Sequence, residues 1–168
     1  MKKIVLLVAA LLAVAAVQAQ SYIVVNSEKI FKSIGSYNDA IQTINDLTRQ
    51  YQQNIDAAYA NVEKLYADYE DQRDYISQSR QAQYENEIAE REKEIADYQK
   101  AVFGPEGELM KKRTELIKPI QDRVFGIINK YAEDNKVGLV LDVATNPSVL
   151  YYSPDMDRTQ AIIELVKQ

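Results

Sequence analysis

The stretch 41-IQTINDLTRQYQQNIDAAYANVEKLYADYEDQRDYI-76 decides the fold. Counted in heptads, one set of positions seven residues apart reads Ile41, Thr48, Ile55, Val62, Tyr69 and Ile76. A second set, three residues after the first, reads Ile44, Tyr51, Ala58, Leu65 and Gln72. Because most of these positions are apolar, the stretch predicts a helix with a coiled-coil seam that Thr48 and Gln72 interrupt.

A second seam follows in the next part of the chain, with Arg91 as its exception. Two seams in one chain indicate a helical hairpin, in which each helix buries its apolar stripe against the other. An outgoing helix of about 40 residues would be roughly 60 Å long at 1.5 Å per residue. A compact domain of this size cannot bury such a helix, so we expect the hairpin to protrude. The second seam comprises Tyr84, Ile88, Ile95, Tyr98, Val102, Leu109 and Leu116.

Two segments are candidates for the tip of this hairpin. We favour Ile76–Arg80, where small polar residues replace the apolar pattern near the middle of the helical stretch. The alternative is Gly104-Pro105-Glu106-Gly107, which would make the two helices very unequal in length. With the earlier tip, Pro105 begins a new helical segment after a break, and Pro119 introduces a second kink.

Strand-like segments lie on both sides of the helical stretch. Tyr22–Asn26 precedes it, and Val137–Asp142 and Ser148–Ser153 follow it, joined by the turn-rich residues 144–148. We predict that the last two form a β-hairpin that pairs with the first. The chain then ends in a short helix capped by Asp155 or Asp157, with Ile162, Ile163 and Val166 on its apolar face. The predicted fold class is α+β, a small β body from the terminal strands with a long, protruding antiparallel coiled-coil hairpin.

The first residues have the features of a signal peptide. Lys2 and Lys3 precede an apolar run from Ile4 to Val17, and Gln18-Ala19 completes a cleavage pattern. The run is shorter than the roughly 20 apolar residues that span a bilayer. We therefore expect residues 1–19 to be removed during export. The remaining residues 20–168 would form a single domain, with a body at 20–36 and 120–168 and a helical arm at 37–119.

Composition argues against several classes of function. Removing Lys2 and Lys3 from the 20 basic side chains leaves 18 against 25 acidic ones, a net charge of −7. Nucleic acids and anionic membranes bind mainly through basic surface, so neither is an expected partner. The chain has no cysteine and no histidine, which removes the commonest metal ligands, the usual general base and the thiol nucleophile. We expect no enzyme, no cofactor and no metal.

Segments at both ends and in the middle of the chain together resemble a known family. Tyr22–Asn26 runs into Ser27–Phe31, a Gln/Glu/Lys-rich helical hairpin follows, and Val137–Asp142 and Val149–Tyr152 come near the end. This arrangement resembles the Skp/OmpH family of periplasmic chaperones over essentially all of residues 20–168. The resemblance implies a homotrimer whose three hairpins surround a central cavity. It also implies an ATP-independent holdase that binds unfolded outer-membrane β-barrel proteins in the periplasm and prevents their aggregation.

One departure from the family concerns charge. Skp is basic and this chain is acidic, which argues against carrying over any contact with lipopolysaccharide or lipid. The main alternative function is a structural coiled-coil adaptor or spacer of the cell envelope that binds one folded partner at the hairpin tip. A hydrolase is a weaker alternative, since the sequence contains no nucleophile elbow, phosphate loop or metal motif.

Tyrosines and apolar body residues are the candidate functional side chains. Tyrosines in the arm could line the cavity and hold apolar clients weakly, or they could flank and seal the helix–helix seam, as we expect for Tyr51 and Tyr69. The proposed client-contact residues are Tyr59, Tyr66, Tyr75 and Tyr84. Residues expected to pack within the body and across a subunit interface are Ile23, Val25, Phe31, Leu139, Leu141 and Leu150.

Overall fold

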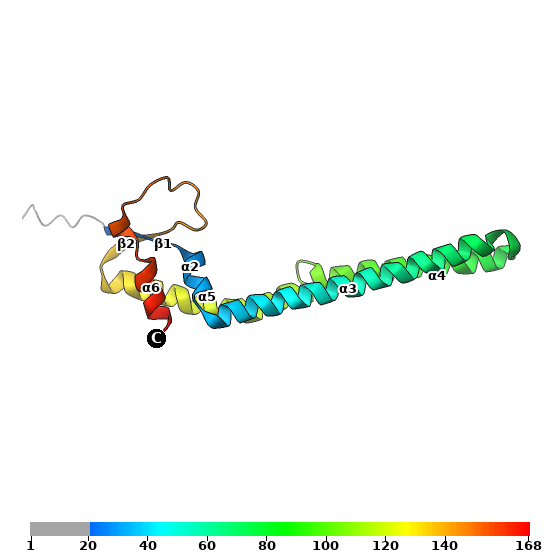
Figure 1. Ribbon diagram of the computed structural model, residues 1–168, viewed down its shortest axis with the longest axis horizontal. Helices are drawn as coiled ribbons and strands as arrows, with labels where there is room; N and C mark the ends of the chain where they lie inside the picture. The colour runs from blue at the N-terminus through cyan, green and yellow to red at the C-terminus, as the bar shows by residue number, and fades with distance from the viewer. Residues whose placement is uncertain (1–20) are drawn as a thin grey trace, which may run out of the picture. The chain divides into compact units, whose positions relative to one another are not determined.

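The computed structural model describes residues 21–168, so the predicted signal peptide lies outside the described residues. Two compact units make up this part of the chain: residues 35–121 form one, and residues 21–34 with 122–168 form the other. The elements in chain order are β1 (Ser21–Val25), α2 (Ser27–Lys32), α3 (Gly35–Gln72), the 3-10 turn η1 (Arg73–Tyr75), α4 (Gln78–Phe103), α5 (Glu108–Asp134), β2 (Val137–Asp142), the 3-10 turn η2 (Pro154–Met156) and α6 (Thr159–Val166) (Figure 1).

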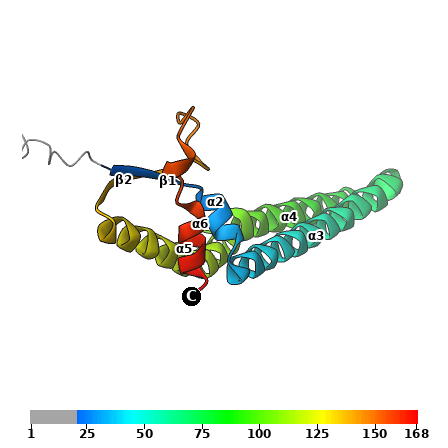
Figure 2. The same ribbon diagram turned by 60° about the vertical axis from the view of Figure 1, so that its left-hand side comes forward.

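The unit of residues 35–121 is an antiparallel helical hairpin. Helix α4 lies beside the part of α3 nearest the tip in both ribbon views (Figures 1 and 2). Their shared core repeats every seven residues, which confirms both predicted seams. Tyr51, Ala58, Leu65 and Tyr84 are partly buried against this core. The buried residues are Ile55, Val62 and Tyr69 from α3, and Ile88, Ile95 and Val102 from α4.

The hairpin turns at η1 and the two residues after it. Helix α4 begins at Gln78, and the Ser77 hydroxyl caps it by accepting a hydrogen bond from the backbone N–H of Arg80 at 3.3 Å. The favoured tip is therefore confirmed, although the turn starts a few residues before Ile76. The alternative tip at Gly104–Gly107 is wrong, because the chain there passes from α4 into α5 within the returning half of the hairpin.

The break between α4 and α5 depends on its two glycines. A Cβ atom on Gly104 would lie 2.3 Å from the carbonyl oxygen of Lys100, and one on Gly107 would lie 2.7 Å from that of Val102. The Gly107 N–H donates to the Gly104 carbonyl at 2.9 Å and closes the turn. Helix α5 begins at Glu108, three residues after Pro105, and continues through Pro119. Its first part completes the base of the hairpin, where Ile117 is buried with Ala40 and Ile44.

The second unit is built on a two-stranded parallel sheet. Strands β1 and β2 pair in a register that sets Tyr22 against Leu139 and Val24 against Leu141. One sheet face packs on helices α2, α5 and α6, because side chains alternate between the two faces of a strand. Phe31, Tyr131, Val140 and Ile163 pack around this core. Its buried residues are Ile23, Val25, Ile30, Val124, Ile128, Ile162 and Val166.

The predicted β-hairpin at the C-terminal end of the chain is wrong. Within residues 21–168 the sheet has two strands, and residues 148–153 lie in the loop that follows β2. A strand needs a partner for its backbone groups, and the chain turns away after Asp142, whose carboxylate accepts hydrogen bonds from the Ala144 N–H at 3.0 Å and the Thr145 hydroxyl at 3.1 Å. Neither predicted cap occupies the N-cap position of α6, which is Arg158 and has no side-chain capping hydrogen bond. The Asp157 carboxylate, one residue earlier, accepts a hydrogen bond from the Thr159 N–H at 2.8 Å.

Candidate functional site

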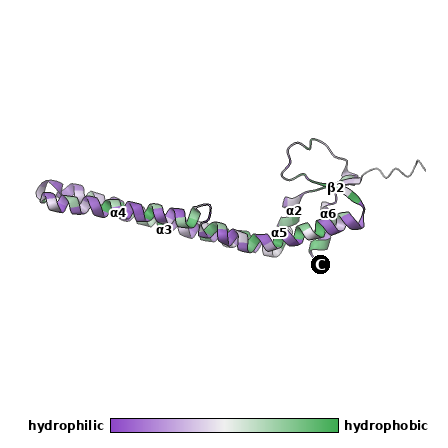
Figure 3. Cartoon of the chain, turned by 180° about the vertical axis from the view of Figure 1, so that it is seen from behind, coloured by the Kyte–Doolittle hydropathy of each residue, from purple (hydrophilic) through white to green (hydrophobic). Residues whose placement is uncertain are grey.

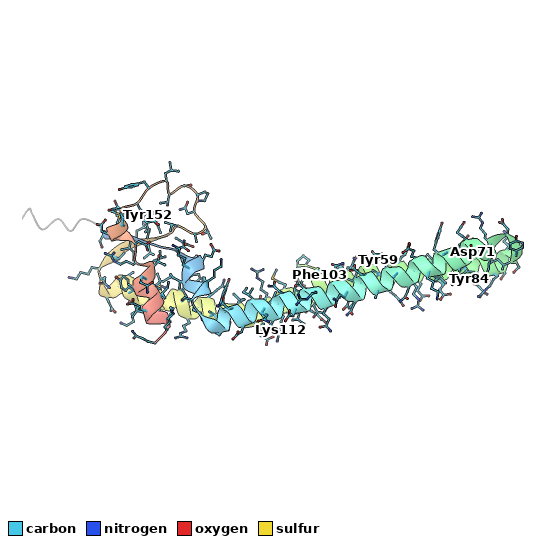
Figure 4. The ribbon with its side chains drawn as sticks, in the orientation of Figure 1. Tyr59, Asp71, Tyr84, Phe103, Lys112 and Tyr152 are labelled. Atoms are coloured by element: carbon cyan, nitrogen blue, oxygen red, sulfur yellow. The ribbon has the colours of Figure 1, made fainter. Side chains whose placement is uncertain are left out.

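The hairpin carries large aromatic side chains that it does not bury. The exposed fractions are 47% for Tyr59, 54% for Tyr66 and 90% for Tyr75. Tyr59 and Tyr66 project from α3 just beside the seam, one residue after Ala58 and Leu65 (Figure 4 labels Tyr59). Tyr75 lies in the turn at the tip. Three of the four proposed contact tyrosines are thus accessible on the hairpin surface.

The fourth, Tyr84, belongs to a packed cluster near the tip. Its ring stacks on that of Tyr69, with centroids 5.5 Å apart, and the Arg80 guanidinium lies 4.7 Å above its ring centroid. The Tyr69 hydroxyl donates a hydrogen bond to Glu85 at 2.8 Å. That bond, together with burial and the Glu85 charge, raises the pKa of Tyr69. Tyr69 therefore serves the seam, as predicted, and Tyr84 is only half exposed.

A second aromatic cluster lies beside the helix break. Tyr51 makes edge contacts with Tyr98 and Phe103, at centroid distances of 6.4 and 6.1 Å, and its hydroxyl donates to Glu108 at 3.1 Å. Burial and the Glu108 hydrogen bond raise the pKa of Tyr51. The predicted role of Tyr51 in the seam is confirmed. This cluster joins α3 to both sides of the break between α4 and α5.

A groove opens along one edge of the hairpin, with a volume of about 620 Å³. Its floor is apolar, with Ile55, Val62 and Ile95 from the core. It forms because the seam is weak here: the small Ala58 and the charged Arg91 occupy positions where large apolar residues would close the gap. Arg91, the exception in the second seam, indicated this weak point in the sequence, but the groove was not predicted. Figure 3 shows apolar and polar residues interspersed along α3 and α4.

The proposed body residues fall into two groups in the structure. Ile23 and Val25 are buried in the core of their own unit, and Phe31 is half-buried with its ring edge-on to Phe125 at 6.3 Å. Leu139 is 54% exposed and Leu150 is 93% exposed. Leu141 is half-buried on the same sheet face as Leu139. Tyr22, which pairs with Leu139, and Tyr151, which follows Leu150, are also exposed, at 51% and 83%.

A polar anchor ties the end of β2 to the start of α2. The Asp142 carboxylate accepts hydrogen bonds from the backbone N–H of Ser27 at 3.0 Å and from its hydroxyl at 2.5 Å. Burial alone would favour the neutral carboxyl, but the bonds from Ser27, Ala144 and Thr145 outweigh it and hold the pKa of Asp142 below its ordinary value. Asp142 is therefore a structural group.

The charged clusters of the hairpin form exposed ion pairs. Arg91 pairs with Glu94 at 3.1 Å, Lys93 with Asp97 at 3.6 Å, and Lys112 with Glu115 at 2.9 Å. No group of carboxylates between residues 21 and 168 is arranged to hold a metal ion. In the same part of the chain, no helix has the length and apolarity needed to cross a bilayer.

Comparison with known proteins agrees with this architecture. A family model described as "Outer membrane protein (OmpH-like)" matches residues 21–166. The chain belongs to the OmpH-like family. Its fold also resembles the crystal structure of a candidate outer membrane chaperone (OmpH-like) from Caulobacter crescentus CB15, with a TM-score of 0.68 and 12% sequence identity over 87% of this chain and 83% of that one. No curated protein matches the sequence. The family resemblance seen in the sequence is thus confirmed, and this OmpH-like chain shares the helical hairpin and small sheet of its structural relative.

Proposed function

We propose that this OmpH-like chain is an ATP-independent periplasmic holdase that binds unfolded outer-membrane β-barrel proteins and prevents their aggregation. After removal of residues 1–19, three copies assemble through a body formed by residues 20–36 and 120–168. Their arms, residues 37–119, surround a cavity that receives the client. The protein uses no catalytic group, cofactor or metal.

The observation that carries the proposal is the exposure of Tyr59, Tyr66 and Tyr75, which lie outside the buried core of the hairpin. A tyrosine offers a large apolar ring and a polar hydroxyl, so it holds partly apolar chains without requiring one sequence. Each contact is weak, and several arms acting together raise the effective affinity. Release needs no nucleotide, because a client that folds withdraws the apolar surface that was held.

The proposed subunit contact rests on exposed apolar residues of the other unit. Leu139 and Leu150 are exposed in the single chain, and the outer edge of β2 has no partner strand within residues 21–168. Open strand edges beside apolar surface favour pairing with another chain. Leu139, Leu141 and Leu150 therefore form the intersubunit surface, while Ile23, Val25 and Phe31 support it from within each subunit.

The test is the solution mass of residues 20–168, alone and with a urea-unfolded outer-membrane barrel protein, measured by light scattering after size exclusion. We expect a trimer that retains one client in a soluble complex without ATP. A monomer or dimer that leaves the client to precipitate would overturn the proposal.

The second candidate is an envelope adaptor that binds a folded partner at the hairpin tip, and the 90% exposure of Tyr75 favours it. The two functions separate when Tyr75→Ser is compared with Tyr59→Ser/Tyr66→Ser. A tip adaptor loses its partner only with the first variant. A holdase loses client capture mainly with the second.

A further inference from the structure

One helix face combines the exposed tyrosines with carboxylates in a regular order. Asp56, Tyr59, Glu63, Tyr66 and Glu70 follow one another at spacings of three, four, three and four residues along α3. These spacings place all five on one stripe of the helix. All five side chains are exposed. We call them the tyrosine–carboxylate stripe.

The side chains of the stripe make few contacts within their own subunit. Within residues 21–168, Tyr59 and Tyr66 contact no other aromatic ring, and Glu63 forms no ion pair. Asp56 accepts one hydrogen bond from Gln52 at 2.8 Å, and Glu70 pairs with Arg73 at 3.2 Å at the end nearest the tip. Each tyrosine therefore has a carboxylate one turn before it and another one turn after it, and about half of each tyrosine is exposed.

We propose that this stripe binds basic side chains of extended polypeptide, so that clients are selected by arginine and lysine as well as by apolar residues. An open tyrosine ring attracts a cation through its π-electrons, and the flanking carboxylates add charged hydrogen-bond acceptors. The inference rests on the proposed holdase function and names the client segments that this face takes.

The hairpin already contains one contact of this kind. Near the tip, the Arg80 guanidinium lies 4.7 Å above the ring centroid of Tyr84, and Glu85 is the next residue. Here the arginine comes from the same helix as the tyrosine, and its guanidinium makes the cation–π contact with the ring. Tyr59 and Tyr66 also have carboxylates beside them, but no cation from residues 21–168 lies over either ring, so a cation from another chain can take that place.

Charge also decides which occupant fits. Residues 56–97 carry 12 acidic and 5 basic side chains, so this half of the hairpin attracts cationic partners and repels anionic lipid. A second copy docking through its groove would bring three acidic side chains, Asp68, Glu87 and Glu94, and two basic ones, Lys64 and Arg91, against the carboxylates of the stripe, which leaves a net repulsion. A basic, unfolded segment is therefore favoured over another hairpin.

The spacing of the tyrosines predicts a spacing in the partner. Tyr59 and Tyr66 are seven residues apart, which is about 10 Å along the helix axis. In a polyproline-II segment, a conformation common in unfolded chains, residues three apart lie on the same side about 9 Å from one another. Two basic residues at such positions could occupy both tyrosine sites together.

The test uses two short disordered peptides that differ only in charge, one with arginines three residues apart and the other with glutamates at those positions. Their affinities for the assembled protein are measured by fluorescence anisotropy at low and high salt. We expect the arginine peptide to bind about tenfold more tightly at low salt, with a smaller difference at high salt. Equal binding of the two peptides would overturn the inference.

Variants locate the binding to the stripe. Neutralising it with Asp56→Asn/Glu63→Gln/Glu70→Gln should weaken arginine-peptide binding about fivefold. The matched control Asp68→Asn/Asp71→Asn/Glu90→Gln removes the same charge elsewhere on the hairpin and should change binding less than about twofold. An equal loss in both would mean that only net charge matters, which contradicts a defined surface.

The aromatic contribution needs its own variant. Tyr59→Leu/Tyr66→Leu keeps apolar surface but removes the π-electrons and hydroxyls, so it should weaken arginine-peptide binding about threefold or more. Unchanged binding would contradict the role of the rings. The same samples are tested for suppression of aggregation of an unfolded barrel protein. If wild type suppresses aggregation but shows no preference for the arginine peptide, this inference is refuted and the holdase function stands. If wild type prefers the arginine peptide but does not suppress aggregation, the holdase function alone is refuted.

Discussion

At the scale of single residues, two glycines decide whether the returning half of the hairpin can break and resume. Gly104 and Gly107 approach carbonyl oxygens of Lys100 and Val102 so closely that a methyl group would collide with them. The sequence indicated a break from the Gly-Pro-Glu-Gly pattern. The sequence did not reveal which backbone atoms the two glycines contact, because those contacts depend on the path of the chain after Phe103.

Gly104→Ala should lower the free energy of unfolding by about 1–3 kcal/mol, since backbone must move to admit the new methyl group. Gly126→Ala is the matched control: it lies inside α5 with no atom within 4 Å of the added Cβ, and alanine there should stabilise by about 0.5–1 kcal/mol. Urea denaturation at a fixed protein concentration measures both. Equal effects at the two sites would mean that the collision at Gly104 relaxes without cost.

Asp142 gives the body a pH-dependent contribution to stability. Its folded-state pKa lies below the ordinary value of 3.8, so its contribution is complete above 3.8 and is lost as pH falls through the lower folded value. Asp142→Asn should cost about 1–2 kcal/mol at neutral pH. The difference from wild type should shrink below pH 3.8, as measured by urea denaturation across that range. A difference independent of pH would assign the effect to packing.

At the scale of elements, the heptad pattern predicted the helices and the seam of the hairpin but not the groove on its surface. Ile55, Val62 and Tyr69 repeat on a helix and need a partner stripe, so the seam could be predicted from α3 alone. The groove could not, because it depends on Ala58 of α3 lying near Arg91 of α4. The strand prediction failed at residues 148–153 because a strand-like sequence shows only a conformational preference. A strand forms only where the segment can pair with the edge of a sheet, and this segment does not.

Removing residues 56–69 with residues 84–97 deletes two heptads from each helix and keeps the seam in register. The shortened hairpin should fold and leave the number of subunits in the assembly unchanged, because the deleted residues lie outside the body unit. It should lose suppression of client aggregation, measured by turbidity during dilution of an unfolded barrel protein. The full-length control Tyr59→Ser/Tyr66→Ser removes the two exposed tyrosines that the deletion takes away, and so separates loss of length from loss of tyrosines. Full activity of the shortened protein would refute client binding in a cavity between the arms.

At the scale of the whole molecule, the proposed assembly depends on surface that a single subunit leaves uncovered. Leu150 is 93% exposed and Leu139 is 54% exposed, which is unusual for leucines in a domain with a small core. The sequence identified both as body residues. It could not indicate that Ile23 and Val25 would be enclosed within one subunit while these two leucines would remain open.

Leu139→Asp/Leu150→Asp should convert the assembly to monomers, because charge at an apolar contact is costly to bury. Leu150 has almost no contact within its own subunit, so a change there should act through assembly and leave the subunit folded. Light scattering gives the mass, and circular dichroism checks the fold. Tyr59→Asp on the hairpin is the control and should leave the mass unchanged. A double variant that stays assembled would refute this interface.

The sequence by itself determined the two helices of the hairpin, its tip, both strands and the family, because heptad spacing, turn residues and β-branched runs act locally along the chain. Tertiary structure alone decided the parallel pairing of β1 with β2, the loop at residues 148–153, the groove beside Ala58 and the stacking of Tyr84 on Tyr69. Each of these depends on residues distant in sequence or on a competition for partners, and a local pattern carries no information about which partner wins.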